Sequence, residues 1–353
     1  MRRFNLVMAI LILLGATLFA NQETFESTAR FLDLRTLAMG GAGVALADTP
    51  EALYKNPATL YHHSLPMFHL GVHLSEDVGR EVVGDDFAPY VQNPSNAFEI
   101  LLSNRYIALS IALSNILEER NLTPEALYFM GYNESRIQLT LSYGWPIISL
   151  GFFARGGNRS EREVELRKAH VLTDYFRETM FERYRGGTSD AQLFSTGVGV
   201  LLTYQWIAIG IMSDSLFSYD ATSNELTLDL RDLYTGLTVG IAFSSPIYNR
   251  NNELNRIVFN LAFDLTNLGD SAERSINIGI EGKILFLSTV WLALRGGYVE
   301  KRESDSPLFA IDGTGTITFG LGSQIGRVNL AFATLYSLKE DNWRLQAALK
   351  WAL

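Results

Sequence analysis

Short segments along this chain alternate apolar and polar residues with a period of two, which is the pattern of β-strands whose two faces meet different surroundings. At the end of the chain, one face would carry Trp343, Leu345, Ala347, Leu349, Trp351 and Leu353. The other face would carry Arg344, Gln346, Ala348, Lys350 and Ala352. Most segments likewise have one face of large aliphatic and aromatic residues and one of small or polar residues. This asymmetry predicts a wall between lipid and a wet or plugged lumen.

The alternation predicts fourteen strands, joined by connections that are alternately short and long. The expected strands are 66–74, 97–103, 106–114, 135–145, 147–155, 191–204, 206–217, 234–244, 256–266, 275–285, 288–299, 315–323, 327–336 and 342–353. Most are close to the roughly 9–11 residues that a tilted strand needs to cross a bilayer. Tight turns at one end and longer loops at the other are typical of outer-membrane barrels. The sequence therefore predicts an all-β membrane protein, an antiparallel transmembrane β-barrel of about fourteen strands in the cell outer membrane.

Residues 1–20 have the features of a secretory signal peptide. Arg2 and Arg3 precede an apolar run at 6–14, and Phe19 and Ala20 form a suitable cleavage end. A membrane anchor helix is the alternative, but the run is short for a span and no basic segment follows it. The chain has no cysteine, which excludes thiol chemistry and disulfides. Its formal net charge of −9 argues against nucleic acid as a partner, because phosphate binding needs basic residues.

Residues 21–65 do not alternate, and they contain the most specific local signal in the chain. Gly40, Gly41 and Gly43 would let the backbone approach another element closely or adopt a positive φ. Downstream, a threonine and a proline at 49–50 predict the start of a helix. An asparagine and a proline at 56–57 would end it, because proline disfavours the helical conformation of the residue before it.

Residues 39–48 and 54–58 resemble the N-terminal segment of the FadL/PorV superfamily of outer-membrane barrels, and the specific resemblance extends over residues 31–60. In that superfamily the segment is a hatch that plugs a fourteen-stranded barrel and carries an Asn-Pro-Ala motif. The matching residues here are Asn56, Pro57 and Ala58. The resemblance therefore implies a hatch at 21–65 inside a barrel at 66–353.

The resemblance implies two alternative functions. FadL-type members pass long-chain fatty acids or aromatic hydrocarbons, which suggests an outer-membrane channel for passive uptake of hydrophobic small molecules. Lumen faces rich in small residues support this hypothesis, namely Gly197, Gly199, Gly236, Gly240, Gly279, Gly320 and Gly322. PorV-type members instead suggest a structural or secretion-associated barrel that binds envelope or secreted proteins and transports no small molecule. Outer-membrane lipid is an expected partner in both cases, and a lumen filled solidly by residues 21–65 would favour the second.

Two long connections carry helix signals. Ser160 and Glu163 form a capping box, followed by apolar residues at three- and four-residue spacing, which predicts a helical insert at about 160–185. The preceding connection carries the helix-start pair Thr-Pro at 123–124. The large apolar residues of the two connections predict a ligand entry surface made of Leu127, Phe129, Leu172 and Phe176. Alternatively, these apolar faces only pack on each other and cap the barrel.

The polar residues of the predicted lumen face do not indicate a catalytic or metal site. His69 and His73 share that face, but residues four apart on a strand lie about 13 Å apart, so we predict no metal site. The charges expected to face the lumen are Glu99, Arg136, Asp264, Glu281, Lys283, Arg295 and Arg327. We expect them to pair with hatch residues, because an unpaired charge in a packed lumen is costly; a role in selectivity is the alternative. No catalytic motif is found, and we predict neither an enzyme nor a cofactor.

Overall fold

The computed structural model describes most of the chain from residue 33 to residue 352. The described residues are 33–63, 66–78, 92–122, 126–167, 188–214, 216, 218–220, 225–227, 234–245, 248–249, 256–270, 274–287, 290–301, 315–339 and 342–352. The predicted signal peptide at residues 1–20 lies outside them.

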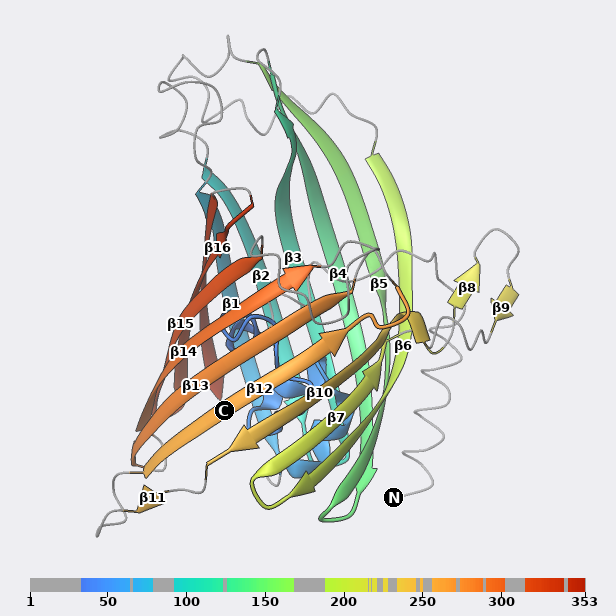
Figure 1. Ribbon diagram of the computed structural model, residues 1–353. Coiled ribbons are helices and arrows are strands. Elements are labelled where there is room, and N and C mark those ends of the chain that lie inside the picture. Colours follow the sequence, from blue (N-terminus) through green and yellow to red (C-terminus); the bar gives the residue numbers. More distant parts are fainter. Residues whose placement is uncertain are drawn as a thin grey trace.

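Within the described residues, fourteen strands form one closed antiparallel barrel (Figure 1). They are β1 (Met67–Val78), β2 (Gln92–Ser103), β3 (Ile107–Leu122), β4 (Ala126–Gly144), β5 (Ile148–Arg167), β6 (Thr188–Tyr204), β7 (Ile207–Ser213), β10 (Leu237–Ser244), β12 (Arg256–Thr266), β13 (Ser275–Leu287), β14 (Val290–Lys301), β15 (Thr316–Ile325), β16 (Val328–Ser337) and β17 (Asn342–Ala352). Each pairs with the next in this order, and β17 pairs with β1 to close the ring. The predicted barrel and its strand count are confirmed.

Three further short strands do not add to the ring. β8 (Ser218–Asp220) and β9 (Glu225–Thr227) pair only with each other in the described part of the chain. β11 (Tyr248–Asn249) pairs with β12, beyond the stretch of β12 that pairs with β10. It therefore continues the line of β10 after a short interruption.

The outer face of the barrel is a band of exposed apolar side chains. On β12, Leu261 is 47% exposed, whereas its neighbour Asn260 points inward and is 2% exposed. On β17, Leu345 is 46% exposed and Gln346 is 4% exposed. An apolar band of this kind is stable against lipid rather than water. The fold and the band together place the chain in the outer membrane. No helix among the described residues is long and apolar enough to cross a membrane.

Aromatic side chains gather at the end of the barrel that carries the short turns. The connection between β4 and β5 has Tyr143 and Trp145 on its outer side, and that between β6 and β7 has Tyr204 and Trp206. All four are at least half exposed. Aromatic girdles of this kind mark the interface between hydrocarbon and headgroups, so this end of the barrel lies at a membrane surface.

The wall is tallest on the side formed by β3, β4, β5 and β6, which rise above the other strands (Figure 1). The predicted helical insert at about 160–185 is wrong over residues 160–167, because β5 continues to Arg167; residues 168–185 lie outside the described residues. Ser160 and Glu163 pair with Asn133 and Met130 of β4 instead of capping a helix. The continuous β4–β5 ladder supplies backbone hydrogen bonds along this whole stretch, and this outweighs a local capping signal.

The predicted helix in the preceding connection is also wrong. β4 begins at Ala126, so Leu127 and Phe129 lie on a strand, and Leu127 pairs with Leu122 of β3. The connection expected at 115–134 therefore shrinks to residues 123–125, because both strands extend far beyond their predicted ends.

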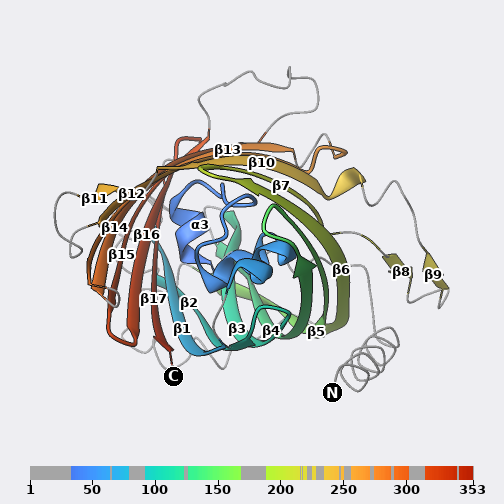
Figure 2. The same ribbon diagram turned by 90° about the horizontal axis from the view of Figure 1, so that it is seen from below.

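The inner segment, residues 33–63, lies within the ring of strands (Figure 2). It contains the helix α3 (Leu34–Ala38) and two 3₁₀ helices, η1 (Pro50–Tyr54) and η2 (Pro57–His62). α3 packs against β14 to β17, and η2 packs against β4, β5 and β6, so the segment spans the lumen from one side to the other. It lies in the half of the barrel nearer the short turns (Figure 1).

We expect Leu261→Arg and Leu345→Arg each to impair assembly of the folded barrel, whereas Leu261→Met and Leu345→Met should assemble normally. An arginine on the lipid face costs roughly 2–4 kcal/mol near the bilayer midplane, and methionine keeps the face apolar. The folded fraction in isolated membranes can be measured by heat-modifiable gel mobility. Equal folded fractions for the arginine and methionine variants would contradict the assignment of the outer face.

Candidate functional site: the inner segment and the lumen

The inner segment meets β14 backbone to backbone at two facing glycines. Gly40 has a φ of +65°, and a Cβ at this position would lie 2.5 Å from the backbone nitrogen of Tyr298. A Cβ at Gly297 would in turn overlap the backbone of Gly40. Gly41 follows with a φ of +82°. Only glycine tolerates this combination of positive φ and close approach, which explains why the sequence places these glycines here.

Glycines on the lumen face of seven strands receive the inner segment in the same way. A Cβ at any of them would overlap an atom of that segment: Gly151, Gly199, Gly210, Gly240, Gly279, Gly297 and Gly320. Small lumen residues were expected to leave room for a channel. In the structure, four of the predicted glycines instead lie against the inner segment, namely Gly199, Gly240, Gly279 and Gly320.

Arg35 joins the inner segment to β13 by a buried ion pair. Its Nη2 lies 2.7 Å from Oε1 of Glu281, and its Nε lies 3.0 Å from Oε2. Nη1 of Arg35 also binds Asp48 at 2.5 Å, within the inner segment. On the wall side, Glu281 accepts from Nε of Arg295 at 2.7 Å and from the amide of Asn260 at 2.8 Å. The Arg35–Glu281 pair is therefore part of a charge network that links the inner segment to β13 and β14.

A second ionic contact joins η1 to β17, four strands along the ring from β13. Nζ of Lys350 on β17 lies 3.1 Å from Oε1 of Glu51 and 3.6 Å from Oε2 of Glu99 on β2. Burial alone would raise the pKa of Glu51, but the charge of Lys350 holds this pKa well below its ordinary value. The Tyr54 hydroxyl hydrogen-bonds to Glu99 and, at 2.7 Å, to Ser110. The inner segment is thus held by ion pairs at two places on the wall, β13 and β17.

The third glycine of the motif, Gly43, lies in a turn whose backbone binds Asp264 on β12. Its Oδ2 accepts hydrogen bonds from the backbone nitrogens of Gly43 at 2.6 Å and Val44 at 2.9 Å. A Cβ at Gly43 would lie 2.8 Å from Oγ1 of Thr36, so a larger residue would disturb the turn that presents these two donors. A wall carboxylate therefore binds the inner segment through its backbone.

The Asn-Pro-Ala turn contacts both the inner segment and the wall. Asn56 is fully buried; its side-chain amide donates to the carbonyls of Val44 at 2.9 Å and Val200 at 3.1 Å. Its Oδ1 accepts from the nitrogen of Ala58 at 3.0 Å, which caps η2, and Pro57 occupies the first position of that helix. The carbonyl of Ala58 accepts from the Ser149 hydroxyl at 3.0 Å. The asparagine therefore fixes three backbone groups at once.

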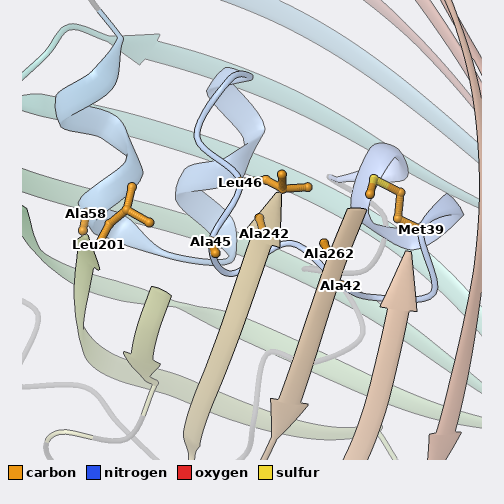
Figure 3. Close-up of a cluster of buried hydrophobic side chains, with 8 residues drawn as sticks. All are labelled: Met39, Ala42, Ala45, Leu46, Ala58, Leu201, Ala242 and Ala262. Atoms are coloured by element: carbon orange, nitrogen blue, oxygen red, sulfur yellow. The ribbon is translucent and has the colours of Figure 1, made fainter. Parts of the chain in front are cut away.

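Apolar packing fills the spaces between these polar contacts. One buried cluster consists of Met39, Ala42, Ala45, Leu46 and Ala58 from the inner segment with Leu201, Ala242 and Ala262 from the wall (Figure 3). Another joins Leu53, Tyr54 and Leu60 to Leu101, Ala108 and Ala112. The wall contributes mainly alanine, so the small lumen residues leave the volume that the larger side chains of the inner segment occupy.

The predicted pairing of lumen charges with the segment before the barrel is confirmed for Glu99, Asp264 and Glu281. Lys283 instead lies over the ring of Trp291, 4.5 Å from its centroid. Arg327 was wrongly assigned to the lumen. It is an exposed residue of the tight turn between β15 and β16, because β16 begins one residue later than predicted.

The predicted entry surface stays a prediction. Leu127 and Phe129 belong to β4, near the end of the barrel away from the short turns, and Leu172 and Phe176 lie outside the described residues. His73 is buried with Nε2 3.4 Å from Oε2 of Glu99. Among the described residues, no group of three or more potential ligands is arranged to hold a metal ion.

We expect Gly297→Ala to loosen the inner segment and Gly296→Ala to leave it in place. The two glycines are adjacent on β14 but face opposite sides. A Cβ at Gly297 would overlap the backbone of the inner segment, whereas at Gly296 its nearest neighbour would be 3.7 Å away. Limited proteolysis of the folded barrel measures access to residues 33–63. Equal cleavage rates in the two variants would contradict close backbone packing at Gly297.

Comparison with known proteins agrees with this architecture. No protein-family model matches the sequence, and a search of curated proteins finds no match. Among solved structures, the CymD monoaromatic hydrocarbon channel aligns at 12% identity with a TM-score of 0.55, covering 90% of this chain and 95% of the other. A Pseudomonas aeruginosa FadL homologue aligns at 10% identity with a TM-score of 0.53, covering 90% and 97%. The Pseudomonas putida toluene transporter TodX aligns at 11% identity with a TM-score of 0.50, again covering 90% and 97%. The chain therefore has the fold of the FadL-type outer-membrane barrels.

Proposed function

We propose that this protein is an outer-membrane channel for the passive uptake of hydrophobic small molecules such as long-chain fatty acids. The observation that carries the proposal is the shared fold: channels described as passing monoaromatic hydrocarbons or toluene align over 90% of this chain. The resemblance of the inner segment to the hatch of the same superfamily supports it independently, because that resemblance rests on residues rather than on shape. Fold alone does not determine function, so the proposal needs a transport measurement.

The shape of the barrel is consistent with uptake from the outer surface. The tall side of the wall, β3 to β6, extends beyond the inner segment, which lies nearer the short turns (Figure 1). A compound arriving at the tall end would enter the lumen before it met the inner segment. The entry surface predicted from the sequence, Leu127, Phe129, Leu172 and Phe176, would capture a hydrophobic compound by burial of its apolar side chains.

One observation favours the alternative, a structural or secretion-associated barrel that binds other proteins. The inner segment contacts the wall at several places around the ring, through the wall glycines, the Arg35–Glu281 pair and the Lys350–Glu51 pair. A segment held in this way obstructs the lumen. In the proposed channel, passage therefore requires the inner segment to move.

Uptake of a labelled long-chain fatty acid by cells expressing the protein tests the proposed function. We expect uptake above that of cells without the protein. The double variant Phe129→Ser with Phe176→Ser should reduce it at least about tenfold, since burying such a side chain contributes about 1.5–3 kcal/mol. Tyr204→Ser, an equally large change on an exposed aromatic residue at the short-turn end, should leave uptake unchanged at matched surface levels. Wild-type cells that take up no hydrophobic compound would favour the protein-binding alternative.

A disulfide between the inner segment and β6 tests whether the segment must move. The chain has no cysteine, so a new pair would be unambiguous. Cγ of Asn56 lies 3.1 Å from the position of a Cβ at Gly199, which brings the two sulfurs of Asn56→Cys with Gly199→Cys within bonding range. We expect the oxidised variant to lose uptake and a reductant to restore it.

The two single-cysteine variants serve as controls for this experiment, because they carry the same side-chain changes without the cross-link. Equal uptake by the oxidised and reduced double variant would show that the compound passes without displacement of the segment at Asn56.

A further inference from the structure

The barrel has one seam, where the first strand of the ring meets the last. Every other pair of neighbours is consecutive among the fourteen barrel strands, whereas β17 pairs with β1 from His69↔Ala352 to Val78↔Trp343 (Figure 2). Almost the whole barrel sequence lies between these paired residues. Loop closure over so long a chain is entropically costly, so we expect the seam to be the last pairing of the sheet to form.

A buried row of charges crosses this seam. Lys350 on β17 pairs with Gly71 on β1, and Gly71 pairs with Glu99 on β2. Although β1 lies between the two charged residues, Nζ of Lys350 is 3.6 Å from Oε2 of Glu99. A Cβ at Gly71 would lie 3.4 Å from Oε2 of Glu99 and 3.5 Å from Cγ of Lys350. The glycine therefore leaves the space in which the last strand and the second strand form an ion pair across the first.

The inner segment contacts both sides of the seam. On the β17 side, Oε1 of Glu51 lies 3.1 Å from Nζ of Lys350. On the other side, the Tyr54 hydroxyl hydrogen-bonds to Glu99 on β2 and to Ser110 on β3. Apolar contacts follow the same division, because α3 packs against β16 and β17, while η1 and η2 share a buried cluster with β2 and β3. The inner segment therefore bridges the seam on its lumen side.

The separation of these contacts along the chain indicates the order in which they form. Tyr54 is 45 residues from Glu99 and 56 residues from Ser110, whereas Glu51 is 299 residues from Lys350. Contacts over shorter separations cost less chain entropy and form earlier. Once the inner segment is seated on β2 and β3, Glu51 and Glu99 place two carboxylates beside the unpaired edge of β1. Their charge attracts Lys350 as β17 approaches.

From this geometry we propose that the inner segment guides closure of the barrel: Glu51, held beside the edge of β1, captures Lys350 and brings β17 into register with β1. This role is independent of transport and holds for either function considered above. Register is critical here, because a slip of one residue turns every side chain of a strand to the opposite face and would place Lys350 against lipid. A slip of two residues would move Lys350 about 7 Å along the strand, away from Glu51. The ion pair therefore selects the native register.

Folding kinetics test this role. The protein is purified from the outer membrane, unfolded in urea and refolded into dilauroylphosphatidylcholine vesicles, and the folded fraction is followed by heat-modifiable gel mobility. We expect Glu51→Gln to slow folding at least about fivefold, the range for a charged hydrogen bond that is half formed in the transition state. Its unfolding rate should change less, because an interaction already made in the transition state acts mainly on folding. Lys350→Met should slow folding similarly, and the double variant should fold no more slowly than either single variant.

Arg35→Met is the matched control, since it removes the other ion pair between the inner segment and the wall, at β13 and away from the seam. β13 is consecutive in the chain with both of its neighbours, so this variant should unfold faster and keep its folding rate within about twofold. Should Glu51→Gln yield no folded protein, Glu51→Asp keeps the charge with a shorter reach and should fold more slowly than the wild type. A folded Glu51 variant that folds at the wild-type rate and only unfolds faster would overturn the proposal. Equal slowing of folding by Arg35→Met would do the same, because the effect would then not belong to the seam.

Discussion

Closure of the sheet between β1 and β17 is the constraint on which the rest of this structure depends. In lipid an unpaired backbone group has no water to bind, so the only stable sheet is one without edges. Closure gives every strand an outer and an inner face, and the period-two alternation follows from it. It also creates an enclosed lumen whose polar lining must be satisfied. The wall carboxylates Asp264 and Glu281 each accept hydrogen bonds from residues 33–63, so the inner segment satisfies polar groups of the wall as well as obstructing the lumen.

The strands were predictable because their signal is local and repeated. Alternation identifies each of the fourteen barrel strands from its own residues, and a closed antiparallel order follows from the short turns. The partners across the lumen were not predictable in the same way. Arg35 and Glu281 are 246 residues apart, and sequence shows only that both carry charge. The glycines indicated close backbone contact, but not that Gly40 would meet Gly297, because that pairing depends on where the inner segment lies within the closed ring.

One repeated sequence shows how far local signals extend. The six residues Thr-Pro-Glu-Ala-Leu-Tyr occur at 49–54 and again at 123–128. In the first copy, Pro50–Tyr54 is a 3₁₀ helix whose Leu53 and Tyr54 pack into a buried cluster. In the second copy, Ala126 to Tyr128 begin β4; all three pair with β5, and Leu127 and Tyr128 also pair with β3. The same helix-start chemistry is present in both. Partner strands on two sides supply backbone hydrogen bonds that a short isolated helix cannot match, and this is why Leu127 lies on a strand.

Several charged side chains of the lumen hold the inner segment against the wall. Where the inner segment meets the wall, cations and carboxylates occur together, as in the contacts of Glu51 with Lys350 and of Arg35 with Glu281. Such pairs satisfy each other and leave nothing for a ligand. Arg136 differs, because in the described part of the chain its guanidinium nitrogens have no hydrogen-bond partner and its contact with the inner segment is the π face of Tyr54. This contact therefore depends on cation–π attraction rather than on a salt bridge.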